Sequence, residues 1–104
     1  MTDVPDSCTL PTAEQPLRVA EFDTLLASAL LAQSRPAPTR LRWRLRPSSA
    51  PVARDLAARE AECCAFFRFR FEPSEPALTL EIEVPAARTG VLDGLAARAA
   101  AALG

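Results

Sequence analysis

The stretch that decides the fold is residues 67–84, which read FRFRFEPSEPALTLEIEV. Two runs in which apolar and charged residues alternate flank a turn at 73–76 that contains two prolines. Such alternation at a period of two, broken by a turn, predicts a β-hairpin. With residue 72 opposite residue 77, Arg68 faces Glu81 and Phe69 faces Leu80. Both faces of the hairpin are then chemically consistent.

The same alternation occurs at 39–46, where leucine and tryptophan point one way and four arginines the other. Helical periodicity predicts three helices around these strands. The first helix ends before Pro36 and Pro38, and its apolar stripe is Phe22, Leu25, Leu26, Ala29 and Leu30. The second helix spans about 51–65, and its apolar stripe is Val52, Leu56 and Cys63. The third helix spans about 88–103, and its apolar stripe is Val91, Leu92, Leu95, Ala99 and Ala102.

The predicted order is therefore α-β-α-β-β-α. It indicates an α+β fold, a two-layer sandwich in which helices cover one face of a three-stranded antiparallel sheet. A split β-α-β arrangement, with the third strand between the first and second, sets glutamates between two arginine-bearing strands. Residues 1–17 hold three prolines and no apolar period, and we expect an irregular segment there. Residues 18–104 form a single α+β domain in this prediction.

The composition excludes several classes of chemistry. The chain of 104 residues has no His, Lys, Tyr or Asn, and all 12 basic residues are Arg. Histidine-dependent nucleophiles, histidine metal sites and lysine Schiff bases are excluded. A net charge of −1 argues against a nucleic-acid or membrane partner. No signal peptide or membrane-spanning stretch is visible, so we expect a cytoplasmic protein.

The three cysteines are the main functional clue. Cys63 and Cys64 are adjacent near the end of the second helix, and Cys8 is the only further thiol. Helix geometry predicts that Cys63 faces the core and that Cys64 lies at its margin. Three thiolates without imidazole suit a soft ion such as Hg(II), As(III) or Cu(I). Zn(II) needs a fourth ligand, for which Glu60, Glu62 or water are the candidates.

Two other interpretations of the cysteines stay open. Free cysteine often serves as a small buried hydrophobic residue, which makes all three structural. A thiol-dependent reductase would use Cys64 as nucleophile, with Cys8 or Cys63 as the resolving thiol. The negative end of the helix dipole and the neighbouring glutamates disfavour a thiolate, so the chain is more typical of a non-enzyme.

Three segments carry a resemblance to a family. They are residues 8–14 (CTLPTAE), residues 16–18 with 21–23 (PLR and EFD), and residues 62–67 (ECCAFF) with Phe69. Together they resemble a small family of high-GC bacterial proteins with no established activity. A similar cysteine pair occurs near heavy-metal resistance regulators, so the resemblance implies a metal or metalloid role. Arg68 and Arg70 depart from the more neutral residues expected of that family.

The arginines of the three predicted strands share the outward face with Glu72, Glu81 and Glu83. Sheet surfaces that read RNA expose aromatic residues, whereas Trp43 and the strand phenylalanines here fall on the inward side. We therefore interpret the face as cross-strand ion pairs or a homodimer contact. The glutamates at 60, 62, 81 and 83 are expected at solvent-facing or boundary positions, which do not suit acid–base catalysis.

The sequence thus predicts a small cytoplasmic protein that binds a soft metal or metalloid ion through Cys8, Cys63 and Cys64, in a sequestering or delivery role. The alternative is a non-catalytic homodimeric or partner-binding α+β module with structural cysteines. No organic cofactor is indicated.

Overall fold

The computed structural model describes residues 15–104, with the side chains of 15–18 and 63 excepted. Within these residues the fold has three helices and four strands, with two short 3-10 turns at Pro47–Ser49 and Ala86–Arg88. The chain order is α1 (Gln15–Ala29), β1 (Leu30–Ala37), β2 (Arg40–Leu45), α2 (Ala50–Cys63), β3 (Arg68–Ser74), β4 (Ala77–Glu83) and α3 (Thr89–Leu103). Helix α1 begins at Gln15, so residues 15–17 are helical rather than irregular.

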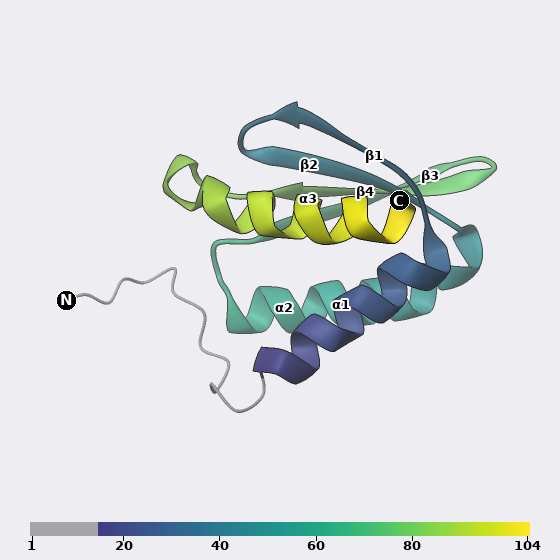
Figure 1. Ribbon diagram of the computed structural model, residues 1–104, viewed down its shortest axis with the longest axis horizontal. Helices are drawn as coiled ribbons and strands as arrows, with labels where there is room; N and C mark the ends of the chain where they lie inside the picture. The colour runs from purple at the N-terminus through teal and green to yellow at the C-terminus, as the bar shows by residue number, and fades with distance from the viewer. Residues whose placement is uncertain (1–14) are drawn as a thin grey trace.

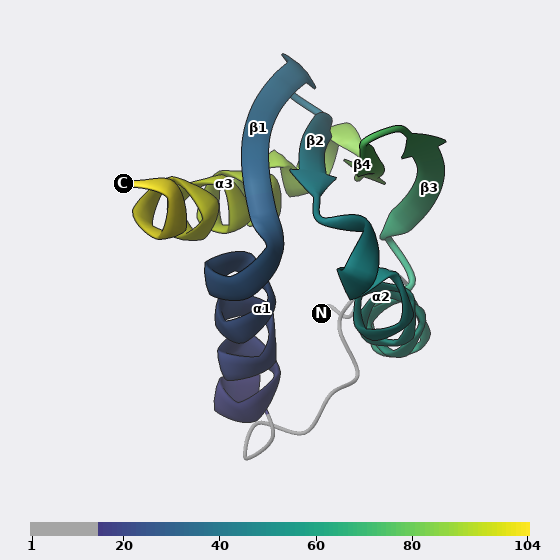
Figure 2. The same ribbon diagram turned by 90° about the vertical axis from the view of Figure 1, so that its right-hand side faces the viewer.

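The strands form one antiparallel sheet in the order β1-β2-β4-β3. The α+β class is confirmed, and β4 lies between β2 and β3 as the charge argument predicted. Figure 2 shows α1 and α2 below the sheet, while α3 passes behind β1 and extends beyond that edge. Figure 1 shows α3 running along the sheet while α1 slopes past α2.

The prediction of three strands was wrong, because residues 30–37 form a fourth. Strand β1 lacks strict alternation, since its pairing with β2 shifts register between Leu30 and Ala32 and again between Ser34 and Ala37. Leu30 also continues the apolar spacing of α1, which made the helix look longer. Pro36 is accommodated because β1 is an edge strand, where a missing N–H leaves no ladder bond unmade.

The register predicted for the second hairpin was wrong by two residues. Pairing continues to Ser74 opposite Ala77, so Arg68 faces Glu83 and Phe69 faces Ile82. The loop is only Glu75-Pro76, joined by a cis peptide bond. Because the shift is an even number, every side chain keeps its predicted face.

The core lies between the inner face of the sheet and the helices. Its most deeply buried side chains come from every layer: Leu26, Leu41, Trp43, Leu45, Leu56, Leu80, Ile82 and Leu92. Trp43 is fully enclosed, and its indole N–H donates to Gln33 Oε1 at 3.0 Å. The Gln33 amide then donates to the Ala96 carbonyl at 3.0 Å. This relay ties the first hairpin to α3.

The buried stripe of α2 differs from the prediction by one position. Val52 is 60% exposed, while the residues that face the core are Ala53, Leu56, Ala57, Glu60 and Cys64. The predicted core face of the helix was based on the large Val52, whereas the face that packs against the core contains the small residues Ala53 and Ala57. Cys64 therefore lies in the core, not at its margin.

Candidate cysteine site

The site begins where α2 ends. Cys64 leaves the helix with an extended backbone (φ −126°, ψ 91°), while its N–H still donates to the Glu60 carbonyl at 2.8 Å. The Phe67 N–H then donates to the Cys64 carbonyl at 3.1 Å. These two bonds make a tight junction between α2 and β3 that turns Cys64 inward, where it is 2% exposed.

Glu60 lies one turn before Cys64 on the same face of α2 and is also buried. Its Oε2 atom is 3.4 Å from Cys64 Sγ. Sequence reasoning placed Glu60 at the boundary of the helix, and that was wrong. The signal was available, because Glu60 follows Leu56 and precedes Cys64 by four residues each. A buried carboxylate beside a sulfur is uncommon, since burial of the charge must be offset by polar partners.

Cys64 is disulfide-bonded in this structure. The chain contains only two other cysteines, Cys8 and Cys63. Cys8 lies outside the described residues, and Cys63 ends α2 with a side chain that is likewise not described. The structure therefore unites Cys64 with Glu60. Within its described part, no group of three or more Cys, Asp or Glu side chains is arranged to hold a metal ion.

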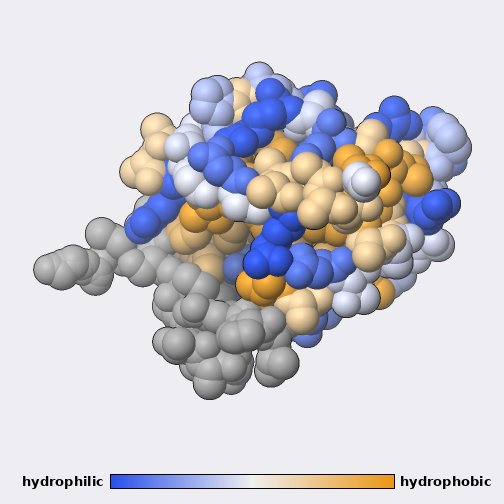
Figure 3. Space-filling model, viewed as in Figure 1, coloured by the Kyte–Doolittle hydropathy of each residue, from blue (hydrophilic) through white to orange (hydrophobic). Residues whose placement is uncertain are grey.

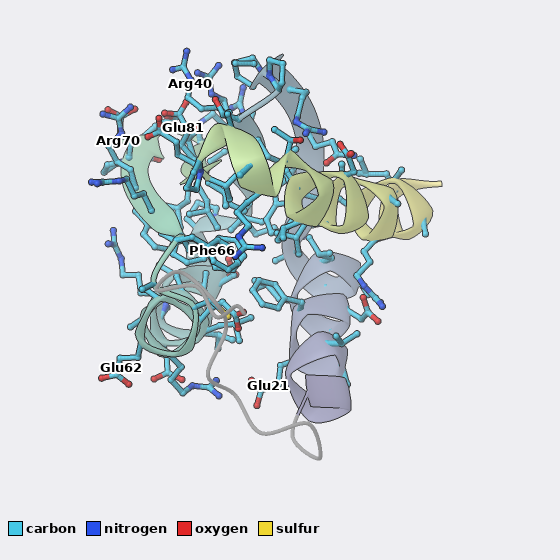
Figure 4. The ribbon with its side chains drawn as sticks, turned by 90° about the vertical axis from the view of Figure 1, so that its left-hand side faces the viewer. Glu21, Arg40, Glu62, Phe66, Arg70 and Glu81 are labelled. Atoms are coloured by element: carbon cyan, nitrogen blue, oxygen red, sulfur yellow. The ribbon has the colours of Figure 1, made fainter. Side chains whose placement is uncertain are left out.

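Aromatic rings enclose the segment after Cys64. Phe66 and Phe67 have ring centroids 4.7 Å apart, and Phe67 stacks on Phe69 at 5.1 Å. The guanidinium of Arg88 lies over the Phe66 ring, 5.3 Å from its centroid. In Figure 4, Phe66 sits between the sheet and the helices, whereas Glu62 points away from α2. The junction is thus apolar on the sheet side.

The outward arginines form a second polar feature, on the other face of the sheet. Arg42 and Arg70 both donate to Glu81, at 2.8 and 2.7 Å, from the two strands that flank β4. These hydrogen bonds lower the pKa of Glu81 below its ordinary value. Figure 4 shows Glu81 and Arg70 together on the side of the sheet away from the helices. These ion pairs match the cross-strand interpretation of the face.

A groove between α1 and α2 was not predicted from the sequence. It has a volume of about 610 Å³ and is lined by Leu25, Ala29, Val52 and Leu56 together with several hydroxyl side chains. Arg59 closes one end through ion pairs to Glu21 at 2.9 Å and to Asp55 at 3.0 Å. The sequence carried no signal for it, because Val52 was predicted to lie in the core, whereas it is exposed on the wall of the groove.

The surface over α3 is mildly hydrophobic in Figure 3, where the alanine-rich helix lies between charged patches. In the described part of the chain, no helix has the length and apolar character needed to cross a membrane. Comparison with protein-family models, with curated proteins and with solved structures finds no match for this chain.

Proposed function

We propose that the reduced protein binds a soft metal or metalloid ion through Cys8, Cys63 and Cys64 and serves to sequester or deliver it. The ion belongs to the Hg(II), As(III) or Cu(I) type, because sulfur ligands without imidazole favour soft ions. A reducing compartment such as the cytoplasm would keep the thiols available. One observation carries the proposal: Cys64, buried just after the end of α2, is disulfide-bonded to another cysteine of the chain.

Sulfur atoms that can form a disulfide can also converge on one ion. Reduction of the disulfide adds two electrons and two protons and yields two thiols, and the ion then replaces the thiol protons. Glu60 supports this step, because its Oε2 lies 3.4 Å from Cys64 Sγ. In the reduced protein, the Cys64 thiol can donate to that carboxylate, which receives the proton or supplies an oxygen ligand.

The test is a titration of reduced, reductant-free protein with Hg(II), As(III), Cu(I) and Zn(II), followed by native mass spectrometry. We expect one soft ion per chain and no binding to the oxidised protein. Cys64→Ser should abolish binding, and Cys8→Ser and Cys63→Ser should each weaken it. If no soft ion is retained, or if all three variants bind like the wild type, the proposal fails.

Glu60→Gln tests the carboxylate, and Glu62→Gln is its matched control on the same helix. Glu60 is buried beside the sulfur, whereas Glu62 is exposed. Loss of affinity in Glu60→Gln alone would assign the carboxylate to the site. Equal behaviour of both variants would leave the ion to sulfur ligands only.

The second candidate is a non-catalytic homodimeric or partner-binding module in which the cysteines serve packing. The groove between α1 and α2, with the exposed Val52 on its wall, favours it. An apolar surface of this kind is typical of binding sites. Static light scattering over a wide concentration range tests the homodimer, and a constant monomer mass would remove that form of the candidate.

A further inference from the structure

The two edges of the sheet differ in how they could accept another strand. Strand β1 is irregular, with two register shifts and Pro36, and the Arg35 side chain folds back onto the Pro38 carbonyl at 2.8 Å. Bulges and prolines are devices that prevent edge pairing. Strand β3 instead pairs with β4 without a shift from Arg68 to Ser74. In residues 15–104, no strand pairs with the outer side of β3, which Figure 2 shows at the opposite edge from β1.

The backbone of β3 offers a short, complete set of hydrogen-bonding groups at this edge. In a hairpin with a two-residue loop, the residues flanking the loop, here Ser74 and Ala77, pair through hydrogen bonds, and such pairs alternate along the ladder. Phe69 and Phe71 therefore direct their N–H and C=O groups outward. The hydrogen bond from Val84 N–H to the Thr39 carbonyl agrees with this pattern. It directs the backbone groups of every second residue before Val84 on β4 toward β2, so the residues between them bond to β3. Pro73, the next outward position, has no N–H and ends the available edge.

The charges on the outer face of β3 are complementary to a reversed copy of themselves. Arg70, in the middle, is held by Glu81 at 2.7 Å and is thereby drawn toward β4. Arg68 and Glu72 lie two residues to either side of it, and both are exposed. Among the described residues, neither of them makes a side-chain hydrogen bond or an ion pair. The strand thus carries one cation and one anion that are available at equal distances from a central residue.

We propose that β3 pairs antiparallel with β3 of a second copy of this chain, about a two-fold axis at Arg70. The inference rests on the second candidate function and specifies its surface. Phe69 then lies opposite Phe71 of the partner subunit. On each chain, the N–H and C=O groups of Phe69 and Phe71 form hydrogen bonds to the other chain. Arg68 lies opposite Glu72 of the partner subunit, and the symmetry repeats both contacts. The two sheets become one continuous eight-stranded sheet.

The side chains on both faces suit this register. Phe69 and Phe71 are only half-buried, and facing aromatic residues on paired strands stabilise a sheet. The Phe71 ring is already covered on the helix side by Arg54, 4.6 Å from its centroid. Arg70 meets its own copy at the axis, and its ion pair with Glu81 offsets that repulsion.

A charge exchange tests the register. Arg68→Glu sets two carboxylates opposite each other at both ends of the interface, and Glu72→Arg sets two guanidinium groups there. Each single variant should raise the dimer Kd about ten- to a hundredfold, since two contacts change from attraction to repulsion. An equimolar mixture of the two variants should recover the dimer as a heterodimer, and the double variant should recover the homodimer.

Sedimentation velocity gives the masses, and circular dichroism checks that each variant is folded. Arg44→Glu is the matched control, because it reverses an exposed arginine on the same face but on the interior strand β2. It should leave the Kd within about twofold of the wild type, as expected for a surface change outside the interface. A wild-type protein that stays monomeric would overturn both this inference and the homodimer candidate. If the wild type dimerises but the single variants have the same dimer Kd, or if the mixture of variants does not recover the dimer, the β3 interface alone would be overturned.

Discussion

The two hairpins of the sheet are built in different ways. The first, β1–β2, is irregular in register and is fixed from within, because Trp43 is enclosed and bonded through Gln33 to α3. The second, β3–β4, is regular, and its outer face is fixed by the ion pairs that Glu81 makes to both neighbouring strands. Burial can therefore stabilise a hairpin of irregular register, while an alternating sequence and surface ion pairs can stabilise a regular one.

Replacing the central aromatic residue of each hairpin by alanine should give the largest difference in stability between the two hairpins. Trp43→Ala should lower the free energy of unfolding by about 3–5 kcal/mol, because a fully buried ring leaves a cavity. Phe71→Ala in the second hairpin should cost about 1–2 kcal/mol, since that ring is only half-buried. Urea denaturation followed by circular dichroism measures both. Equal losses would contradict the view that the first hairpin depends more on burial.

The relay through Gln33 should have the next largest effect. Gln33→Ala leaves the indole N–H of the buried Trp43 without its acceptor, at a cost of about 1–3 kcal/mol. Ser34→Ala is the control, because this neighbouring side chain is exposed and should change stability by less than about 0.5 kcal/mol. The same denaturation assay applies, and indistinguishable variants would show that the relay adds nothing to the attachment of α3.

Glu81→Gln should have the smallest effect, and its effect should depend on pH. The pKa of Glu81 is lower in the folded protein, so its carboxylate stabilises the fold above the unfolded-state pKa of about 4.3. That contribution is lost as the pH falls through the folded-state pKa. At pH 7 we expect the variant to be about 1 kcal/mol less stable than the wild type.

The difference between the wild type and Glu81→Gln should narrow as the pH falls below about 4.3. Glu83→Gln is the control, since Glu83 is exposed and makes no side-chain ion pair within the described residues. Stability curves measured from acid to neutral pH should converge for the wild type and Glu81→Gln, whereas Glu83→Gln should stay within about 0.5 kcal/mol of the wild type at pH 7. A constant offset for Glu81→Gln would contradict the role of its charge.

Much of the fold was predictable because alternation and charge agree. The strands that contain Trp43, Phe69 and Ile82 show the period of two, and the glutamates of β4 placed it between arginine strands. Strand β1 was not predictable, because its side chains alternate poorly and two of them, Gln33 and Arg35, bond to α3 far along the chain. Alternation also leaves the register undetermined to within two residues, since such a shift moves no side chain to another face.

The candidate site was predictable in its residue types but not in its geometry. The adjacent cysteines identified the end of α2, yet the wrong choice of stripe placed Cys64 at the margin of the core, where it is in fact buried. Adjacent helical residues differ by roughly 100°, so an error of one position in the stripe moves a side chain into or out of the core. The burial of Glu60 was missed for the same reason. The three-cysteine metal site remains a prediction, because two of its side chains lie outside the described part of the structure.

The place of β4 at the centre of the sheet has a consequence for synthesis of the chain. This strand is the last to be made, yet β2 and β3 both bond to it rather than to each other. While a ribosome is still adding residues 64–83, β2 has only β1 of its two neighbouring strands, and Trp43 lacks Leu80, its register partner on β4. Closure of the sheet therefore waits for contacts that are distant in sequence, which favours late, cooperative folding over growth strand by strand.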